Sequence, residues 1–364
     1  MQNILYFLFN FVQNFLQVYP MATQILIEEF LEKAKHYQVI DVRSPGEYEH
    51  GHIPGAINIP LFDNDERAVV GTIYKKNGKN LSIIKGLEFV GPKLAEFAKL
   101  ALKFKNENTL IYCWRGGMRS ASMAWLFETV ELKTFVLTGG YKSYRTFLLN
   151  SFNKPLKLIV LGGYTGAGKT DILKALEQHG EQIIDLEGLA QHKGSAFGAL
   201  GQKPQPTVEM FENMLFDKIN QLDKSLPVWI EDEGKNIGCV NICNTIWNQL
   251  SNAPIVIADT NYNIRLNRLL KNYACFPKED LKTAIKKIEK RLGYDNCQKA
   301  LKECDVENFE KVAEICLTYY DKAYNLQLTE RLGKTINQTP KVTTNIINGI
   351  TISNLKNIAN RLYK

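Results

Sequence analysis

Residues 156–170 read LKLIVLGGYTGAGKT, and this stretch decides the fold of the second half of the chain. Its apolar start, Leu156 to Leu161, predicts a buried β-strand, and the motif G-x-x-x-x-G-K-[ST] follows directly. A helix is expected from about Gly168. Glycines in such a loop expose backbone N–H groups to phosphate, while a lysine supplies a cation and a threonine hydroxyl can hold Mg²⁺. The predicted phosphate-binding residues are Gly163, Gly166, Gly168, Lys169 and Thr170.

Further apolar runs at 182–185, 227–230 and 254–258 predict more strands around this loop. A polar stretch that ends in proline, Ser151 to Pro155, marks the start of this unit. After Asn263 we expect no more strands, only helices with basic faces such as 278–291 and 306–323. The sequence therefore predicts an α/β domain over 151–263, followed by a helical, basic C-terminal region over 264–364.

Polar segments follow two of these strands, at the edge where open α/β sheets bind ligands. We interpret them as a second candidate site, in which the acidic residues after the 227–230 strand lie beside a metal ion and His192 and Lys193 contact phosphate. The alternative is an acidic loop with a structural histidine, since a lone histidine is more often structural. The candidate residues are Asp185, Glu187, His192, Lys193, Ser195, Glu231 and Asp232.

The first half of the chain also alternates between strand and helix patterns. Apolar runs at 38–42, 109–112 and 134–137 predict buried strands, and helices are expected at 92–104 and 120–127. Such an order is typical of a parallel sheet that is covered on both faces. We therefore predict a first α/β domain over 21–150.

A cysteine ends the second of these strands, and residues 113–120 read CWRGGMRS. Two glycines allow successive N–H groups to point inward, and a helix that begins near Ser120 adds its positive end. Because these groups favour thiolate over thiol, we predict a lowered pKa and a reactive sulfur, with an oxyanion bound beside it. The alternative is a buried structural cysteine, which would not explain the adjoining glycines and arginines. The predicted catalytic residues are Cys113, Arg115, Gly116, Gly117 and Arg119.

Upstream, residues 41–60 read DVRSPGEYEHGHIPGAINIP, and this segment resembles the signature of rhodanese sulfurtransferases. The resemblance matches Cys113 to the cysteine that carries the persulfide, and it gives Asp41, Glu47 and His52 framework roles. Five residues separate Cys113 from Arg119, so the loop is roomier than is common in rhodaneses and resembles that of cysteine phosphatases. Residues 65–78 are an insertion, either a surface loop or a segment that faces the substrate.

Together, the cysteine loop, the insertion, the P-loop and segment 185–198 resemble bacterial tRNA 2-selenouridine synthases. The resemblance implies action on 2-thiouridine at the wobble position of tRNA. A geranyl group from geranyl diphosphate would first be placed on the sulfur, and selenium from selenophosphate would then replace the geranylated sulfur. Cys113 would carry the selenium as a selenopersulfide. No tightly bound cofactor is expected apart from Mg²⁺ with the phosphates.

Charge is unevenly distributed along the 364 residues, whose formal net charge is +7. From Tyr262 onward there are 19 Lys and Arg against 11 Asp and Glu, a balance of +8, so the rest of the chain is near neutral. Such asymmetry points to a polyanionic partner, here tRNA, or to a solvated helical surface.

The seven cysteines lack the spacing of a disulfide scaffold or a zinc site. Residues 1–20 are predicted to be an appended amphipathic segment, with Met21 as an alternative natural start. Since no segment resembles a membrane span, we expect a cytoplasmic protein.

Three other functions stay open at this point. The first is a rhodanese-type sulfurtransferase fused to a P-loop kinase or NTPase that acts on a small molecule. The second is a cysteine phosphatase, and the third is a rhodanese-like binding module without activity. The sequence also leaves open which tRNAs are chosen, whether ATP binds, which domain hosts geranylation and the oligomeric state.

Overall fold

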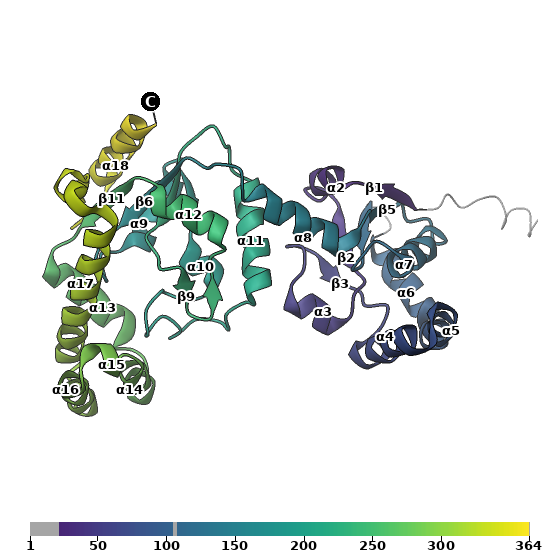
Figure 1. The fold of residues 1–364 in the computed structure, drawn as a ribbon, viewed down its shortest axis with the longest axis horizontal. Coiled ribbons are helices and arrows are strands. Elements are labelled where there is room, and N and C mark those ends of the chain that lie inside the picture. The colour runs from purple at the N-terminus through teal and green to yellow at the C-terminus, as the bar shows by residue number, and fades with distance from the viewer. Residues whose placement is uncertain (1–21, 105–107, 364) are drawn as a thin grey trace, which may run out of the picture. The chain divides into compact units, whose positions relative to one another are not determined.

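The structure is a computed structural model that describes residues 22–104 and 108–363 (Figure 1). The segment predicted over 1–20 lies outside the described residues. The chain divides into two compact units, with the boundary between Ser151 and Phe152. We describe each unit by itself.

Unit 1 contains a five-stranded parallel sheet in the order β1-β5-β4-β2-β3. The three predicted strands are confirmed, whereas the two short edge strands were not predicted. The strands are β1 (Thr23–Ile25), β2 (Gln38–Asp41), β3 (Ile57–Asn58), β4 (Thr109–Tyr112) and β5 (Thr134–Leu137).

Helices cover both faces of this sheet, as predicted. Ile111 of β4 packs with Phe97 and Phe127 from the helices α6 and α7. The preceding residue, Leu110, faces the opposite side of the sheet because side chains alternate along a strand, and it is buried too. The helices that cover the sheet are α2 (Ile27–Lys33), α6 (Leu94–Ala101), α7 (Met118–Glu128) and α8 (Gly140–Ser151), and the short helix α3 (Pro45–His50) follows β2 in the chain.

The insertion over 65–78 is helical, which excludes the first of its two alternatives, a surface loop. It forms α4 (Asn64–Asn77), which packs against α5 (Lys79–Val90). The cause is local: Asp63 accepts a hydrogen bond from the Glu66 N–H at 2.8 Å while the Glu66 carboxylate accepts one from the Asp63 N–H at 3.0 Å. This reciprocal cap satisfies two backbone donors and starts the helix. Short 3₁₀ helices at Gly91–Lys93 and Leu102–Phe104 flank α6.

Unit 2 contains a second five-stranded parallel sheet, in the order β12-β11-β6-β8-β7. The four predicted strands are confirmed. The expectation of no strand after Asn263 is wrong, because β12 pairs with β11; only Val342 of its three residues is buried, so the local pattern is weak. The strands are β6 (Leu158–Gly162), β7 (Gln182–Ile184), β8 (Val228–Glu231), β11 (Ile255–Asp259) and β12 (Lys341–Thr343).

Five helices belong to this sheet region, together with a small antiparallel pair, β9 (Asn236–Ile237) and β10 (Val240–Asn241). Ile172 of α9 and Leu355 of α18 pack in one core with Ile159 of β6. The C-terminal helix α18 is thus part of the α/β core. The helices are α9 (Lys169–Gln178), α10 (Leu186–Ala190), α11 (Val208–Asn220), α12 (Asn244–Asn252) and α18 (Gly349–Leu362).

A cluster of helices lies between β11 and β12 in the chain (Figure 1). It has a core of its own, in which Ile285, Cys297 and Cys316 are buried together. Both predicted helices are confirmed, although the first divides near Ile288 and the second extends to Leu332. The elements are α13 (Tyr262–Tyr273), α14 (Lys278–Lys287), α15 (Glu289–Leu292), α16 (Tyr294–Asp305), α17 (Phe309–Leu332) and the 3₁₀ segment Gly333–Gln338. Within the described residues, no helix is both long and apolar enough to cross a membrane.

Candidate active sites

The cysteine loop connects β4 to α7 in unit 1. Cys113 follows the last residue of β4, is buried, and accepts a backbone hydrogen bond from Tyr141 N at 2.8 Å. Gly116 has a φ of +62°, and a Cβ at this position would lie 2.5 Å from the carbonyl oxygen of Leu137. Only glycine fits this turn, which brings the Gly117 N–H to 3.4 Å from the Cys113 Sγ.

Opposing effects act on the Cys113 thiol. Burial alone would raise its pKa, but the Ser120 hydroxyl at 3.2 Å, the Arg119 charge and the backbone N–H groups of Ser120 and Arg115 lower it. The net effect is a pKa below the ordinary value, as predicted. A lowered pKa increases the fraction of thiolate, which is the nucleophilic form of the sulfur.

Arg119 lies beside the thiol because a carboxylate from another segment holds it there. Its Nη1 donates to the Glu47 Oε2 at 2.9 Å, and Arg67 of α4 reaches the other oxygen of that carboxylate at 3.4 Å. Burial would raise the pKa of Glu47, but the Arg119 charge and hydrogen bond lower it. The insertion is thereby connected to the cysteine loop through one carboxylate. Arg115 is exposed at the same loop.

A buried ion pair supports the loop from the other side. The Arg43 Nη2 donates to Asp41 at 2.6 Å, and the Arg43 guanidinium lies 3.9 Å from the centroid of the Tyr141 ring. Since the Tyr141 N–H binds the Cys113 carbonyl, this pair fixes the base of the loop. These contacts match the framework role expected for Asp41. His52 Nδ1 lies 2.9 Å from the Tyr48 carbonyl oxygen, within the same segment.

In unit 2, the P-loop lies between β6 and α9, in the strand–loop–helix order that was predicted. Gly168, the residue before α9, has a left-handed φ of +84° that favours glycine. The Lys169 Nζ donates to the Gly163 carbonyl at 3.3 Å, and the Thr170 hydroxyl donates to the Glu187 carboxylate at 3.1 Å. Gly166 has a left-handed φ as well.

Three glutamates gather beside the Lys169 and Thr170 side chains. The Glu187 N–H donates to the Glu231 Oε1 at 2.6 Å, while the other Glu231 oxygen is buried without a hydrogen-bond partner among the described residues. Burial raises the pKa of Glu233 to about 8; the Lys169 charge opposes this shift and Glu187 adds to it. Burial also raises the pKa of Glu231, aided by the charges of Asp185 and Glu187.

The other residues of the predicted second site have separate surroundings. Asp185 caps α10 by accepting from the Gly188 N–H at 2.6 Å. Asp232 accepts from Arg331 at 2.8 Å and from the Tyr324 hydroxyl at 3.0 Å, so it binds two residues of α17. In the described ranges, no group of three or more His, Cys, Asp or Glu is arranged to hold a metal ion.

Two residues of the segment after α10 lie near the C-terminal helices. The pKa of His192 is lowered, first by burial and then by the Lys287 charge. The Lys193 Nζ lies 5.4 Å from the centroid of the Tyr273 ring. Ser195 lines a pocket that is described below.

Sequence reasoning missed the side chains that hold the P-loop from α13 and α17. Arg265 Nη1 donates to the Thr165 carbonyl at 3.0 Å, and Arg268 Nη1 donates to the Gly166 carbonyl at 2.6 Å. The Tyr324 hydroxyl accepts from the Gly163 N–H at 2.7 Å. The two arginines lie three residues apart just after β11, a spacing that could have suggested one shared helix face.

Models of known protein families match the segments that contain both sites. A family model described as the tRNA 2-selenouridine synthase AAA domain matches residues 156–344, and a rhodanese-like domain model matches residues 26–146. The first match covers more than half of the chain. The chain belongs to the tRNA 2-selenouridine synthase family. This confirms the resemblance seen in the motifs and the expected α/β class, with a rhodanese-like domain before a P-loop domain.

Relatives that carry the name tRNA 2-selenouridine synthase match over different lengths. The protein from Sulfurovum sp. (strain NBC37-1) is 34% identical over 81% of this chain and 90% of its own length. The one from Nitrosomonas europaea is 36% identical over 65% of this chain and 63% of its own length. Among solved structures, a rhodanese-related protein from Thermoplasma volcanium is 21% identical with a TM-score of 0.23, covering 34% of this chain and 92% of that one.

Proposed function

We propose that this protein is a tRNA 2-selenouridine synthase, which replaces the sulfur of 2-thiouridine by selenium at the wobble position of tRNA. The observation that carries the proposal is the presence of a lowered-pKa cysteine loop and a P-loop in one chain of this family. We place the reaction in the cytoplasm, where tRNA is found.

The first step is alkylation of the thiocarbonyl sulfur by geranyl diphosphate. The sulfur forms a bond to C1 of the geranyl group as the C–O bond breaks and diphosphate leaves, and N3 of the base loses its proton to solvent. Thiocarbonyl sulfur is a poor leaving group, and alkylation makes it a good one. The P-loop is suited to the departing diphosphate because its N–H groups and the Lys169 ammonium stabilise the charge that develops there.

In the second step, selenium attacks C2 of the base and geranyl thiolate leaves with a proton from solvent. Selenophosphate supplies the selenium, and its tetrahedral phosphoryl group suits the roomy loop between Cys113 and Arg119. Gly117 N–H, the amino end of α7 and the exposed Arg115 provide anion-binding groups there.

The form in which Cys113 carries selenium depends on redox balance. Sulfur in the thiolate and selenium in selenophosphate are both fully reduced, so a selenopersulfide on Cys113 also requires a two-electron oxidant. Without an oxidant, attack of the thiolate at phosphorus would release selenide and leave an S-phosphocysteine. Of these two routes, attack at phosphorus is the one that balances with the thiolate and selenophosphate alone.

The P-loop side chains fit a magnesium ion that is shared with phosphate. The Thr170 hydroxyl and the Glu187 carboxylate are oxygen donors that lie together, and Mg²⁺ is commonly held by one or two protein oxygens and substrate phosphates. The ion would neutralise charge on the diphosphate, and Lys169 would orient the same group.

The decisive experiment compares wobble nucleosides by mass spectrometry in cells with this gene, without it, and with Cys113→Ser. We expect 2-selenouridine only with the wild-type gene, while the purified Cys113→Ser protein keeps the melting temperature of the wild type. Selenouridine at wild-type levels with Cys113→Ser would contradict the proposal. Rapid ATP turnover without any tRNA change would instead favour a sulfurtransferase fused to a P-loop kinase or NTPase.

A further inference from the structure

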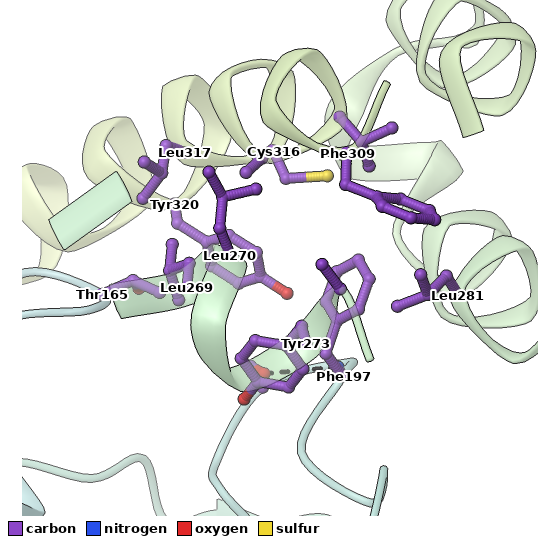
Figure 2. Close-up of a pocket in the computed structure, with 14 residues that line it drawn as sticks. Thr165, Phe197, Leu269, Leu270, Tyr273, Leu281, Phe309, Cys316, Leu317 and Tyr320 are labelled. Carbon is purple, nitrogen blue, oxygen red and sulfur yellow. Dashed lines mark hydrogen bonds between the residues drawn. The ribbon is translucent and has the colours of Figure 1, made fainter. Parts of the chain in front are cut away.

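A largely apolar pocket lies next to the P-loop within unit 2 (Figure 2). Side chains from α13, α17 and the segment after α10 surround about 570 Å³ of space, part of it open to solvent. In Figure 2, Leu270, Tyr273 and Phe309 point into this common space.

One end of the pocket belongs to the P-loop itself. Thr165 lines the pocket and is the third residue of the loop that begins at Gly163. Leu269, another lining residue, packs against Gly166, since a Cβ on that glycine would lie 3.2 Å from the Leu269 Cγ. Phosphate groups in the P-loop would therefore lie next to one end of this apolar space.

The lining indicates the chemistry of the occupant. None of the fourteen described lining residues carries a charged side chain. Its few hydroxyl groups come from threonine, serine and tyrosine, and the Tyr320 hydroxyl already accepts a hydrogen bond from the Ala196 N–H at 3.3 Å. A nucleoside would need polar partners for its base edge and sugar, whereas a hydrocarbon chain needs none.

We infer that this pocket binds the hydrocarbon chain of an allylic prenyl diphosphate whose diphosphate lies in the P-loop. The inference rests on the proposed function, because that function requires geranyl diphosphate, and it assigns geranyl binding to unit 2. The pocket binds the hydrocarbon chain of the substrate, and the P-loop binds its diphosphate group. Chain length is then a property of the pocket walls and is separable from phosphate binding.

The test measures binding of three probes to the full-length protein by calorimetry: inorganic diphosphate, dimethylallyl diphosphate and geranyl diphosphate. We expect geranyl diphosphate to bind at least about 10-fold more tightly than dimethylallyl diphosphate, because five more carbons leave water. Equal affinity for these two compounds would overturn the inference.

Two tryptophan variants on the same helix give a matched comparison. Ala313 of α17 lines the pocket, while Ala323 of α17 is exposed. Ala313→Trp fills the space, so we expect it to abolish the preference for geranyl over dimethylallyl diphosphate and leave binding of inorganic diphosphate unchanged. Ala323→Trp should behave as the wild type. If both variants keep the preference for geranyl diphosphate, the geranyl chain binds outside this pocket.

Unchanged binding of inorganic diphosphate also shows that Ala313→Trp is folded; if it does not fold, the milder Ala313→Leu replaces it with the same expected direction. Failure of the inference is distinct from failure of the proposed function. Cells that make selenouridine normally with Ala313→Trp and whose enzyme keeps its chain preference would refute the pocket assignment alone. Cells without gene-dependent selenouridine would refute the function, while the chain-length preference would still test the pocket.

Discussion

The Arg119 guanidinium donates a hydrogen bond of 2.9 Å to the Glu47 carboxylate, a residue 72 positions earlier in the chain. Glu47 belongs to α3, whereas Arg119 is the second residue of α7, the helix that follows the cysteine loop. The pair keeps a positive charge close to the Cys113 sulfur and prevents the arginine from turning into solvent. The reactivity of the thiol therefore depends on a contact between α3 and α7, which cannot be inferred from the sequence of either helix alone.

Replacing Arg119 by Gln should raise the pKa of Cys113, because the Arg119 charge is one of the effects that lower it. The thiolate would then form at a higher pH than in the wild type. The measurement is the rate of iodoacetamide alkylation at Cys113 against pH, with the modified peptide identified by mass spectrometry. Arg115→Gln is the control, since only the backbone N–H of Arg115 lowers this pKa. A profile that shifts in neither variant, or equally in both, would refute the role of Arg119.

Replacing Lys169 by Ala should impair geranylation of thiolated tRNA more than selenation of tRNA that is already geranylated. The reason is that Lys169 lies in the P-loop of unit 2, whereas the thiolate lies in unit 1. Both reactions are measured separately by nucleoside mass spectrometry. Lys174→Ala, at an exposed position of the same helix, should affect neither. An equal loss of both reactions in Lys169→Ala would mean that the P-loop does not serve the allyl diphosphate.

Replacing Glu233 by Gln should stabilise the protein at alkaline pH. Burial raises the pKa of Glu233 from 4.5 to about 8, so the folded state favours the protonated form. Its contribution to stability is full below pH 4.5 and is lost as the pH rises through about 8. The variant cannot ionise, so its melting temperature relative to the wild type should rise between pH 6 and pH 9. The exposed Glu177→Gln should show no such trend, and a constant difference for Glu233→Gln would argue against a buried proton.

Local sequence patterns were sufficient for the parts of the fold in which several consecutive residues are buried. All four residues of β4 and all five of β6 are buried, and both strands precede glycine loops with a recognised chemistry. These patterns placed Cys113 correctly at the end of a strand and Lys169 at the start of a helix. Helix α4 and strand β12 were missed because the first depends on a cap at Asp63 and the second on pairing with β11.

The supporting contacts of both sites could not be predicted for a different reason. Tyr324 binds the P-loop amide of Gly163 from 161 residues away, and Arg268 binds the Gly166 carbonyl from 102 residues away. No periodicity or motif encodes such pairs, because they arise only when the helices between β11 and β12 pack onto the loop. The partners of Asp232 could not be predicted for the same reason, since Tyr324 and Arg331 lie on α17.

The C-terminal basic helices should supply much of the tRNA affinity. Four exposed residues there form no ion pair with other described residues, and one of them, Lys287, lies close enough to His192 to lower its pKa. Because phosphate contacts release counterions, log affinity should fall linearly with log salt, with a slope of roughly −0.7 to −0.9 per contact. The four residues are Lys286, Lys287, Lys290 and Arg291.

Replacing all four by Gln should therefore weaken tRNA binding and flatten the salt dependence by about three units. Alkylation of Cys113 should be unaffected, because that chemistry belongs to unit 1. A control with the same loss of charge replaces four exposed lysines of unit 1 by Gln: Lys35, Lys99, Lys103 and Lys133. Fluorescence anisotropy of labelled tRNA between low and moderate salt measures both slopes. If the C-terminal variant keeps the wild-type affinity and slope, these charges are only a solvated helical face, and tRNA must bind through other residues. If the control variant alone loses affinity, unit 1 holds the tRNA backbone.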